Sequence, residues 1–529
     1  MTIDEHGRKL WQRILPAQRW AFFCCILTGY LTHLFVFTNV IPNADGMSRV
    51  FDPQQMTIAG RWFLHYTTAP NAYTQMPAAI ALLSMVFLGL AAALVVDLLA
   101  IRSKVLAGLT GAIMAAFPSM GFTFLYTFTA SAYCIGIFLA VLSIWLAAKG
   151  RLGLVLGAVA LALSMGVYQA YVTIAIGLAL LVVLKKVLDP NSTFRTTLTK
   201  GLELMGYLAV GAILYYVILL IFLKVKHLEL WSYLGMDSAS GSYPFAQIPA
   251  LILDAYKQVV AFFFVPGTPN AFTTMTMVLL DLAALVLGLL LFLNRLSVKR
   301  LWKEKWRPIT ALAMVALLPL GINFTRLLSP YSDPTPLMKY PFVIVYLALI
   351  LLASLNDGLG KREYILPLAA CWSAALLVFC LNTNNLMYTA SAQAHRATQS
   401  YVTRLMARVE SCPGYEPGME VLFIGAVPQD QIYSQVESYS KVDHYSVPLN
   451  SVVPLNKHLY YYLEDWLNVP IKEPNEEIMI SVSNSKAFRD MPLYPQEGSV
   501  QVLDGRLVVK LQPEYKPKTQ FELDYEQRH

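Results

Sequence analysis

The segment from Asn43 to Trp62 holds the side chains of this chain that are best suited to chemistry. It carries two carboxylates and two guanidinium groups, on Asp45, Asp52, Arg49 and Arg61. Apolar stretches precede and follow the segment, which places it at a membrane surface. A positioned carboxylate can take the proton of an attacking sugar hydroxyl, and arginine binds phosphate through two parallel hydrogen bonds. The pattern therefore predicts chemistry on a lipid-linked phosphate.

Asp45 is the first candidate for a general base, and Asp52 is the second. A phosphate leaving group departs without being protonated, so one carboxylate is enough, whereas glycosidases usually need an acid as well. The alternative for Asp45 is a structural role as the N-cap of a helix in a solvated loop. Arg49 follows Asp45 by four positions, so a helix over this stretch would place both on one face.

Four cations are candidates for binding the phosphate of a donor substrate: Arg49, Arg61, Arg326 and Lys339. Arg326 and Lys339 flank a second loop, INFTRLLSPYSDPTPLMKYP, in which prolines and serines disfavour a regular helix. Each cation also has a structural alternative. Arg61 and Trp62 together are typical of a membrane-interface anchor, and Lys339 could reach the interface from a helix end.

Tyr168, Gln169 and Trp62 are candidates for binding sugar. Gln169 lies between two apolar stretches, with tyrosines on either side in the order Tyr168-Gln169-Ala170-Tyr171. An amide and phenols at membrane depth can hydrogen-bond sugar hydroxyls. Polar packing between helices is the alternative, which we favour for Tyr171 and not for Gln169.

Composition identifies a membrane protein. Of 529 residues, 56% are hydrophobic and 14% are charged, with a mean hydropathy of +0.51, whereas soluble domains carry about 25% charged residues. The net charge of +7 comes from cations in short loops between apolar stretches, and this arrangement needs no nucleic-acid partner. The chain has no CxxC or HExxH pattern, so a zinc site has little support.

We predict a polytopic α-helical membrane protein with about eleven transmembrane helices. The predicted spans are 20–41, 77–100, 104–118, 127–148, 152–166, 167–188, 202–224, 271–294, 308–323, 339–356 and 364–382. Lysine and arginine are concentrated in alternate loops, which the positive-inside rule assigns to the cytoplasm. The N-terminus is then inside, and the Asp45 loop and the C-terminal tail are outside.

Three regions follow from these spans. Residues 1–19 form a basic, amphipathic cytoplasmic N-terminus, and residues 20–382 form the transmembrane part with an outer loop at 42–76. Residues 383–529 are polar and are predicted to form an extracytoplasmic α+β domain. In that domain we expect a helix at about 385–410 and strands at MEVLFIG, IMISVS and SVQVL…RLVVKL, the last pair joined by a turn at Asp504-Gly505.

Four pieces of the chain together carry a resemblance to a known family. They are NADGMSR, GRW, SMGVYQAYV and NFTRLL. With the surrounding apolar spans, over roughly residues 15–400, the chain resembles the GtrII-like glucosyltransferases, which are integral-membrane glycosyltransferases of the GT-C class.

The resemblance implies transfer of glucose or a similar sugar from a polyprenyl-phosphate donor, on the outer side of the bacterial inner membrane. The acceptor would be a surface polysaccharide, as in the modification of lipopolysaccharide O-antigen, or a lipid-linked glycan. The catalytic carboxylate of the first outer loop maps onto Asp45, with Asp52 in reserve. Many family members have two adjacent acids where this chain has Ala44-Asp45-Gly46. A monophosphate donor implies that no metal or other cofactor is needed, and we expect inversion at the sugar carbon.

Two other functions remain open at this stage. A flippase or transporter for a lipid-linked glycan would move its cargo without forming a glycosidic bond, but such proteins often show repeated halves, and this chain has no obvious repeat. A glycan polymerase or ligase would use a diphosphate-linked donor instead of a monophosphate.

Overall fold

The computed structural model describes residues 2–47, 53–71, 75–230, 245–267, 273–330, 334–357, 365–428, 432 and 452–517. The chain divides into two compact units. The membrane unit comprises residues 1–40 and 51–385, and the C-terminal unit comprises residues 41–50 and 386–529. The short segment 41–50, which the sequence places in an outer loop of the transmembrane part, thus clusters with the C-terminal unit.

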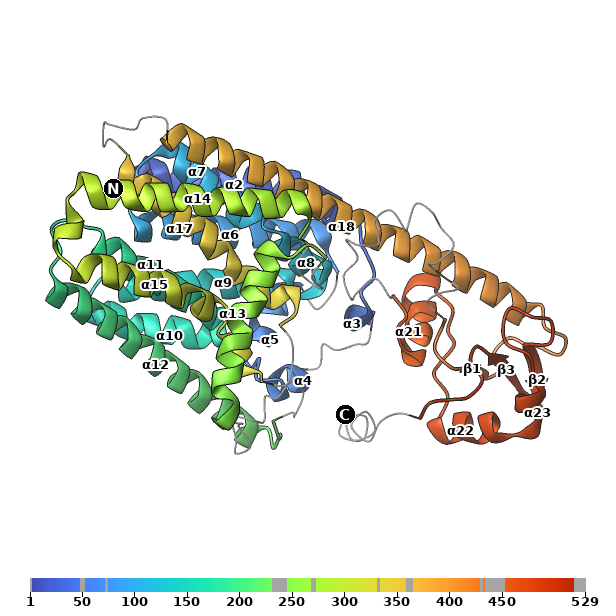
Figure 1. Cartoon of the computed structure of the whole chain (residues 1–529). Helices are drawn as coiled ribbons and strands as arrows, with labels where there is room; N and C mark the ends of the chain where they lie inside the picture. The colour runs from blue at the N-terminus through green and yellow to red at the C-terminus, as the bar shows by residue number, and fades with distance from the viewer. Residues whose placement is uncertain are drawn as a thin grey trace. The chain divides into compact units, whose positions relative to one another are not determined.

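The membrane unit is built from helices, most of which run side by side, while α13 runs at a steep angle to them (Figure 1). Its helices are α1 (Ile3–Arg13), α2 (Pro16–Thr38), α4 (Pro53–Ile58), α5 (Leu64–Thr68), α6 (Pro77–Leu99), α7 (Lys104–Ala116), α8 (Pro118–Leu125), α9 (Thr127–Ala147), α10 (Arg151–Val167), α11 (Val172–Val187), α12 (Phe194–Val225), α13 (Ile248–Phe264), α14 (Met275–Val298), α15 (Trp306–Ile322), α16 (Thr325–Leu328), α17 (Ile344–Asn356) and the first part of α18 (Ile365–Glu410). Short 3-10 helices cover Gln169–Tyr171 (η2) and Pro336–Val343 (η6).

Each of the eleven predicted spans coincides with a helix or a pair of helices. Within the described residues, eight helices are long and apolar enough to cross a membrane. A ninth span is possible if α7 and α8, which are bent by 41° at Phe117, are counted as one broken span. Proline at the first position of α8 explains the bend, because it lacks the N–H that would continue α7. Helices α10 and α15 are apolar but shorter. The fold is that of a polytopic membrane protein.

Lysine and arginine side chains bind the backbone carbonyls at the C-terminal ends of several helices. Lys185 donates to the carbonyl of Leu98 at the end of α6, and Lys200 donates to that of Ala147 at the end of α9. Arg295 joins two more ends, because it donates to the carbonyls of Leu188 after α11 and Leu355 in α17. These bonds place four helix C-termini at one end of the membrane unit, where cations also complement the helix dipoles.

Arg307 makes the most extensive of these caps. Its buried guanidinium group donates to four backbone carbonyls at the end of α11 and in the connection to α12, those of Val187, Asp189, Pro190 and Ser192. Glu304 lies 3.2 Å from its Nε atom. Hydrogen bonds from Arg307 and Trp306 hold the pKa of the Glu304 carboxyl below its usual value. A single side chain thus binds four carbonyls at this one turn of the chain.

Helix α2 packs very closely on α7 at Gly111. A Cβ atom added at Gly111 would overlap with the backbone carbonyl of Ala21. Backbone atoms cannot move aside as a flexible side chain can, so we expect Gly111→Ala to destabilise the protein by about 1–3 kcal/mol. Thermal unfolding of the detergent-solubilised protein measures this effect.

Gly206→Ala is the matched control, because Gly206 lies inside α12 with no atom within 4 Å of an added Cβ. There the change should be neutral or stabilise the helix by up to about 1 kcal/mol. Equal melting temperatures for the two variants would contradict the close packing of α2 on α7.

The C-terminal unit is a three-stranded sheet covered by helices on both faces. Its elements are α3 (Ala44–Met47), the last part of α18, β1 (Val421–Ile424), α21 (Asn456–Leu467), α22 (Glu476–Asn484), α23 (Lys486–Asp490), β2 (Val500–Leu503) and β3 (Arg506–Lys510). The strand order is β1-β3-β2, with β1 parallel and β2 antiparallel to β3 (Figure 1). Asp504 and Gly505 form the β2–β3 turn, both with positive φ, which agrees with the predicted hairpin.

Alternate residues of the strands enter two separate cores. Phe423 and Val509 pack with α18 and α21, while Leu422 and Val508 pack with Met479 of α22 and with α23. Strands β1 and β3 are therefore buried on both faces, as is usual where a sheet lies between helical layers, while β2 at the edge is half-buried.

The prediction of a strand at IMISVS is wrong, because these residues lie in helix α22. The Asn475 side chain accepts a hydrogen bond from the Glu477 N–H, and Glu476 and Glu477 occupy the first turn. An Asn cap followed by acids is a helix-start signal. Here it outweighs the strand preference of the Ile and Val residues that follow it.

Candidate functional site

The GRW motif begins at the end of α4, where Gly60 ends the helix. Gly60 has φ of +76°, its N–H donates to the Thr57 carbonyl, and the Arg61 N–H donates to the Met56 carbonyl at 2.7 Å. This pair of bonds is the Schellman ending, which favours glycine because only glycine adopts positive φ without strain. The turn sends Arg61 and Trp62 back against the helices of the membrane unit.

Trp62 is only 5% exposed and packs against α12. Its ring is nearly parallel to the rings of Tyr215 and Phe222, with centroids 6.5 and 5.6 Å away. The next residue, Phe63, donates its N–H to the carbonyl of Gly166 at 2.8 Å. A Cβ atom at Gly166 would lie 2.7 Å from the Trp62 ring, so glycine is needed there. Among the described residues, the buried Nε1 of Trp62 has no hydrogen-bond partner.

The YQAY motif forms the connection between the end of α10 and the start of α11. Helix α10 ends at Val167, Tyr168 is extended, and η2 follows. From this connection the side chain of Gln169 extends to the turn before GRW, where its amide donates to the carbonyl of Ala59 at 2.7 Å. The neighbouring carbonyl, that of Gly60, accepts a hydrogen bond from the Tyr215 hydroxyl at 3.0 Å. Gln169 and Tyr215 therefore hold the turn at Ala59 and Gly60 in place.

Arg61 lies over the face of Tyr168, with its guanidinium carbon 5.0 Å from the ring centroid. The side chain is half-buried. Stacking on an aromatic ring restricts the plane of the guanidinium, and arginine stays charged at any physiological pH. The structure thus brings Arg61, Trp62, Tyr168 and Gln169 together, and we refer to these four residues as the loop cluster.

The loop cluster lies far from the helix ends that the cations cap. Lys200 lies near the start of α12, at the capped end, whereas the Trp62 ring contacts Tyr215 and Phe222. A helix rises 1.5 Å per residue, which separates Lys200 from Tyr215 and Phe222 by about 22 and 33 Å along the axis. This span is close to the ~30 Å thickness of a bilayer core. The cluster and the capping cations therefore occupy opposite ends of α12.

Tyr215 and Phe222 complete this arrangement, and sequence reasoning missed both of them. They lie within an apolar helix in which aromatic residues are ordinary. No motif or change of composition singles them out. Only their position opposite Trp62 in the folded protein reveals their role.

Asp45 lies in α3 and belongs to the C-terminal unit. Its side chain is exposed, and its N–H donates to Asn43 Oδ1 at 2.9 Å. Asn43, rather than Asp45, therefore caps this short helix. Met47 anchors the segment, because it is 1% exposed and packs in the core that includes Leu459 and Leu463 of α21. Arg49 and Asp52, the other candidates of this stretch, lie outside the described residues.

Arg326 has an acidic partner on another helix. Its Nε lies 2.5 Å from a carboxylate oxygen of Asp254 in α13, and its Nη1 donates to the carbonyl of Pro330 at 3.1 Å. Gln258 donates to the same oxygen of Asp254 at 2.9 Å. Arg326 thus joins α16 to α13. Lys339 is 7% exposed, with its Nζ 5.9 Å from the ring centroid of Phe262.

We expect the Arg326–Asp254 pair to contribute measurably to stability. Arg326→Gln and Asp254→Asn should each lower the free energy of unfolding, and the double variant should lose less than the sum of the two. A coupling energy of about 0.5–3 kcal/mol is typical for residues in direct contact. Chemical denaturation of the three variants in detergent measures it. Strictly additive losses would show that the pair is not formed in solution.

The described residues contain no group of three or more His, Cys, Asp or Glu side chains that could hold a metal ion. The chemistry available at the loop cluster is that of one cation, one amide, one indole N–H and aromatic faces. These groups suit the binding of an anion beside a sugar.

Comparison with known protein families finds a match. The family model described as glucosyl transferase GtrII matches residues 34–353, which include Asp45, the loop cluster, Arg326 and Lys339. Comparisons with curated proteins and with solved structures find no match. Because the family model covers more than half of the chain, the chain belongs to the GtrII family of glucosyl transferases and is a glycosyltransferase with membrane helices.

Proposed function

We propose that this glycosyltransferase moves a glucosyl group from a polyprenyl-phosphate donor to a surface polysaccharide or lipid-linked glycan. The reaction takes place on the outer side of a bacterial inner membrane. The acceptor oxygen attacks the anomeric carbon while the bond from that carbon to the phosphate oxygen breaks, which inverts the configuration. Asp45 receives the acceptor proton, and polyprenyl phosphate leaves as an anion, so no metal ion is required.

One observation supports the location of the donor best. The two most distinctive motifs, GRW and YQAY, are about a hundred residues apart in the chain but pack together. Their meeting is explained if both contact the same substrate, with Arg61 on the phosphate and with Gln169 and the Trp62 N–H beside the sugar.

Stabilisation of the leaving phosphate is the role proposed for Arg61. Negative charge on the departing polyprenyl phosphate grows during the reaction, and a fixed cation lowers the barrier most when it needs no rearrangement. The Tyr168 ring holds the guanidinium for this purpose. Arg49, Arg326 and Lys339 are the further cations of the proposed donor site.

The proposed general base, Asp45, is an exposed carboxylate on a well-anchored segment. Exposure allows an acceptor hydroxyl to approach it, and burial of Met47 limits the freedom of the backbone.

The charge distribution supports the proposed orientation. The cations that cap α6, α9, α11 and α17 lie at one end of the membrane unit, and lysine and arginine mark the cytoplasmic side. The loop cluster lies toward the other end of α12, so it would face outward. Reporter fusions in the loops at 148–150 and 323–335 test this orientation.

Reconstitution in liposomes tests the function. Purified protein is supplied with radiolabelled polyprenyl-phosphate glucose and isolated lipopolysaccharide, and label in the polysaccharide is measured. Transfer from this donor supports the proposal. Consumption of only a diphosphate-linked donor would favour a polymerase or ligase, and movement of the donor across the bilayer without bond formation would favour a flippase.

A further inference from the structure

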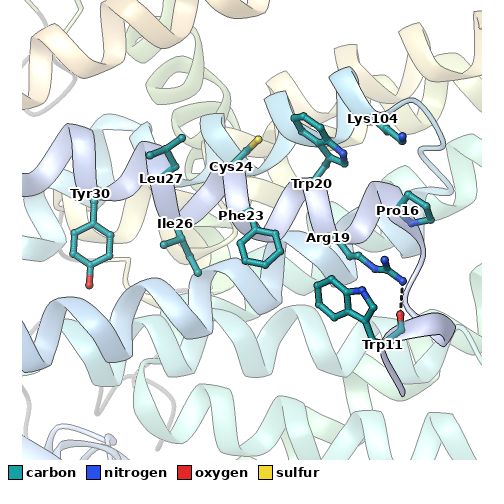
Figure 2. A pocket seen from close by; sticks show the side chains of 10 residues that line it. All are labelled: Trp11, Pro16, Arg19, Trp20, Phe23, Cys24, Ile26, Leu27, Tyr30 and Lys104. Carbon is teal, nitrogen blue, oxygen red and sulfur yellow. Dashed lines mark hydrogen bonds between the residues drawn. The ribbon is translucent and has the colours of Figure 1, made fainter. Parts of the chain in front are cut away.

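A second site lies beside the start of α2, in a groove of about 940 Å³. Figure 2 shows the side chains that line it, with cations at one end and Tyr30 at the other. The groove is not part of the loop cluster and has no role in the proposed transfer reaction. Its walls are mostly aromatic and aliphatic, which makes the two cations notable.

Arg19 is held in place at the cationic end by α1. Its guanidinium carbon lies 4.2 Å from the ring centroid of Trp11, and its Nη2 donates to the Trp11 carbonyl. Its buried Nε has no hydrogen-bond partner among the described residues. Lys104, the first residue of α7, lines the same groove and is exposed. Within the described part of the chain, no salt bridge is formed by either cation.

The apolar part of the groove matches one leaflet of a bilayer in length. Arg19 and Tyr30 lie on α2, whose rise of 1.5 Å per residue separates them by about 16 Å. Half of a ~30 Å hydrocarbon core is about 15 Å. Between them, Phe23 and Leu27 are 54% and 62% exposed, as expected for side chains that face lipid. The cationic end then lies at the level of the lipid headgroups, where tryptophans such as Trp11 and Trp20 are favoured.

We propose that this groove binds an anionic glycerophospholipid from the leaflet at which α2 begins. The lipid phosphate contacts Arg19 and Lys104, and one acyl chain follows Trp20, Phe23 and Leu27. An anionic lipid brings a net negative charge to the two cations, whereas a zwitterionic lipid carries its own compensating cation. The inference goes beyond the proposed function and requires only that α2 lies in a membrane.

Native mass spectrometry of the full chain in detergent tests this site. Phosphatidylglycerol and phosphatidylcholine with identical acyl chains are titrated separately, and bound lipid is counted from the mass of the complex. We expect tighter binding of phosphatidylglycerol and a loss of about 10- to 30-fold in its affinity in the Arg19→Gln/Lys104→Gln variant. The Arg13→Gln/Arg102→Gln variant is the matched control, because it removes two exposed cations from neighbouring positions outside the groove and should bind within about twofold of the parent.

Photo-cross-linking of the unsubstituted chain provides a test that no substitution can disturb. A phosphatidylglycerol with a diazirine in its acyl chain should label peptides within residues 16–30. Three results would overturn the inference: equal affinity for phosphatidylcholine, equal losses in both double variants, or labelling confined to other helices. Binding of glycerol phosphate alone at the same concentration as the lipid would assign the site to a soluble anion instead.

Discussion

Replacement of Asp45 by asparagine is expected to lower kcat/KM for glucosyl transfer by about 10²–10⁴-fold, the usual effect of losing a general base. Asparagine has nearly the same shape but cannot accept the acceptor proton. The Asp45 side chain is exposed, and α3 is capped by Asn43, so folding should not change. The measurement is transfer of labelled glucose from polyprenyl phosphate by the reconstituted variant, with the melting temperature recorded in parallel.

Asp52→Asn is the comparison that assigns the base. If Asp45 is the base, Asp52→Asn should retain most of the transfer rate, and the Asp45→Asn protein should still bind the donor. A fully active Asp45→Asn enzyme would remove Asp45 from the mechanism. Loss of activity in Asp52→Asn alone would transfer the role to Asp52.

Arg61→Gln is expected to lower kcat/KM by about 10²–10³-fold, as is typical when one fixed donor to a developing anion is removed. Glutamine keeps part of the contact with Tyr168 but carries no charge. Arg61→Lys should recover only part of the rate, because an ammonium group cannot match two phosphate oxygens at once. Initial rates over a range of donor concentrations separate an effect on kcat from one on KM.

Arg102→Gln is the control for this experiment, since it removes an exposed cation near the capped end of the helices. It should leave kcat/KM for the donor unchanged. If Arg61→Gln lowers the melting temperature without changing the kinetics of the folded fraction, Arg61 is only a structural partner of Tyr168.

Most helices of the membrane unit could be predicted from the sequence, because each is a long apolar segment that stands out when hydropathy is averaged along the chain. All eleven apolar segments coincide with helices, including the short ones at 104–118 and 152–166, which correspond to α7 and α10. Among the described helices, eight are long and apolar enough to cross a bilayer, and α10 and α15 are shorter than a full span. The bend before Pro118 comes from the missing N–H of one residue, which hydropathy averaged over a segment does not register.

The candidate site was predictable in its pieces but not in its assembly. Motifs identified Arg61, Trp62, Tyr168 and Gln169, but nothing in the sequence states that the Gln169 amide binds the Ala59 carbonyl. Tyr215 was missed because a tyrosine in an apolar helix is unremarkable. The placement of α3 with the C-terminal unit was also unforeseen, since it depends on long-range contacts such as those of Met47 in the core of that unit.

The capping bonds of Arg307 limit the substitutions that can be accepted at this position during evolution. A lysine at position 307 would preserve the charge that guides insertion, but its single ammonium group could not serve four carbonyls. Lys299 and Arg300 are exposed, and within the described part of the chain their side chains bind no comparable set of carbonyls. Related enzymes should therefore exchange lysine and arginine freely at 299 and 300 but keep arginine at 307, because there the shape of the side chain matters as much as its sign.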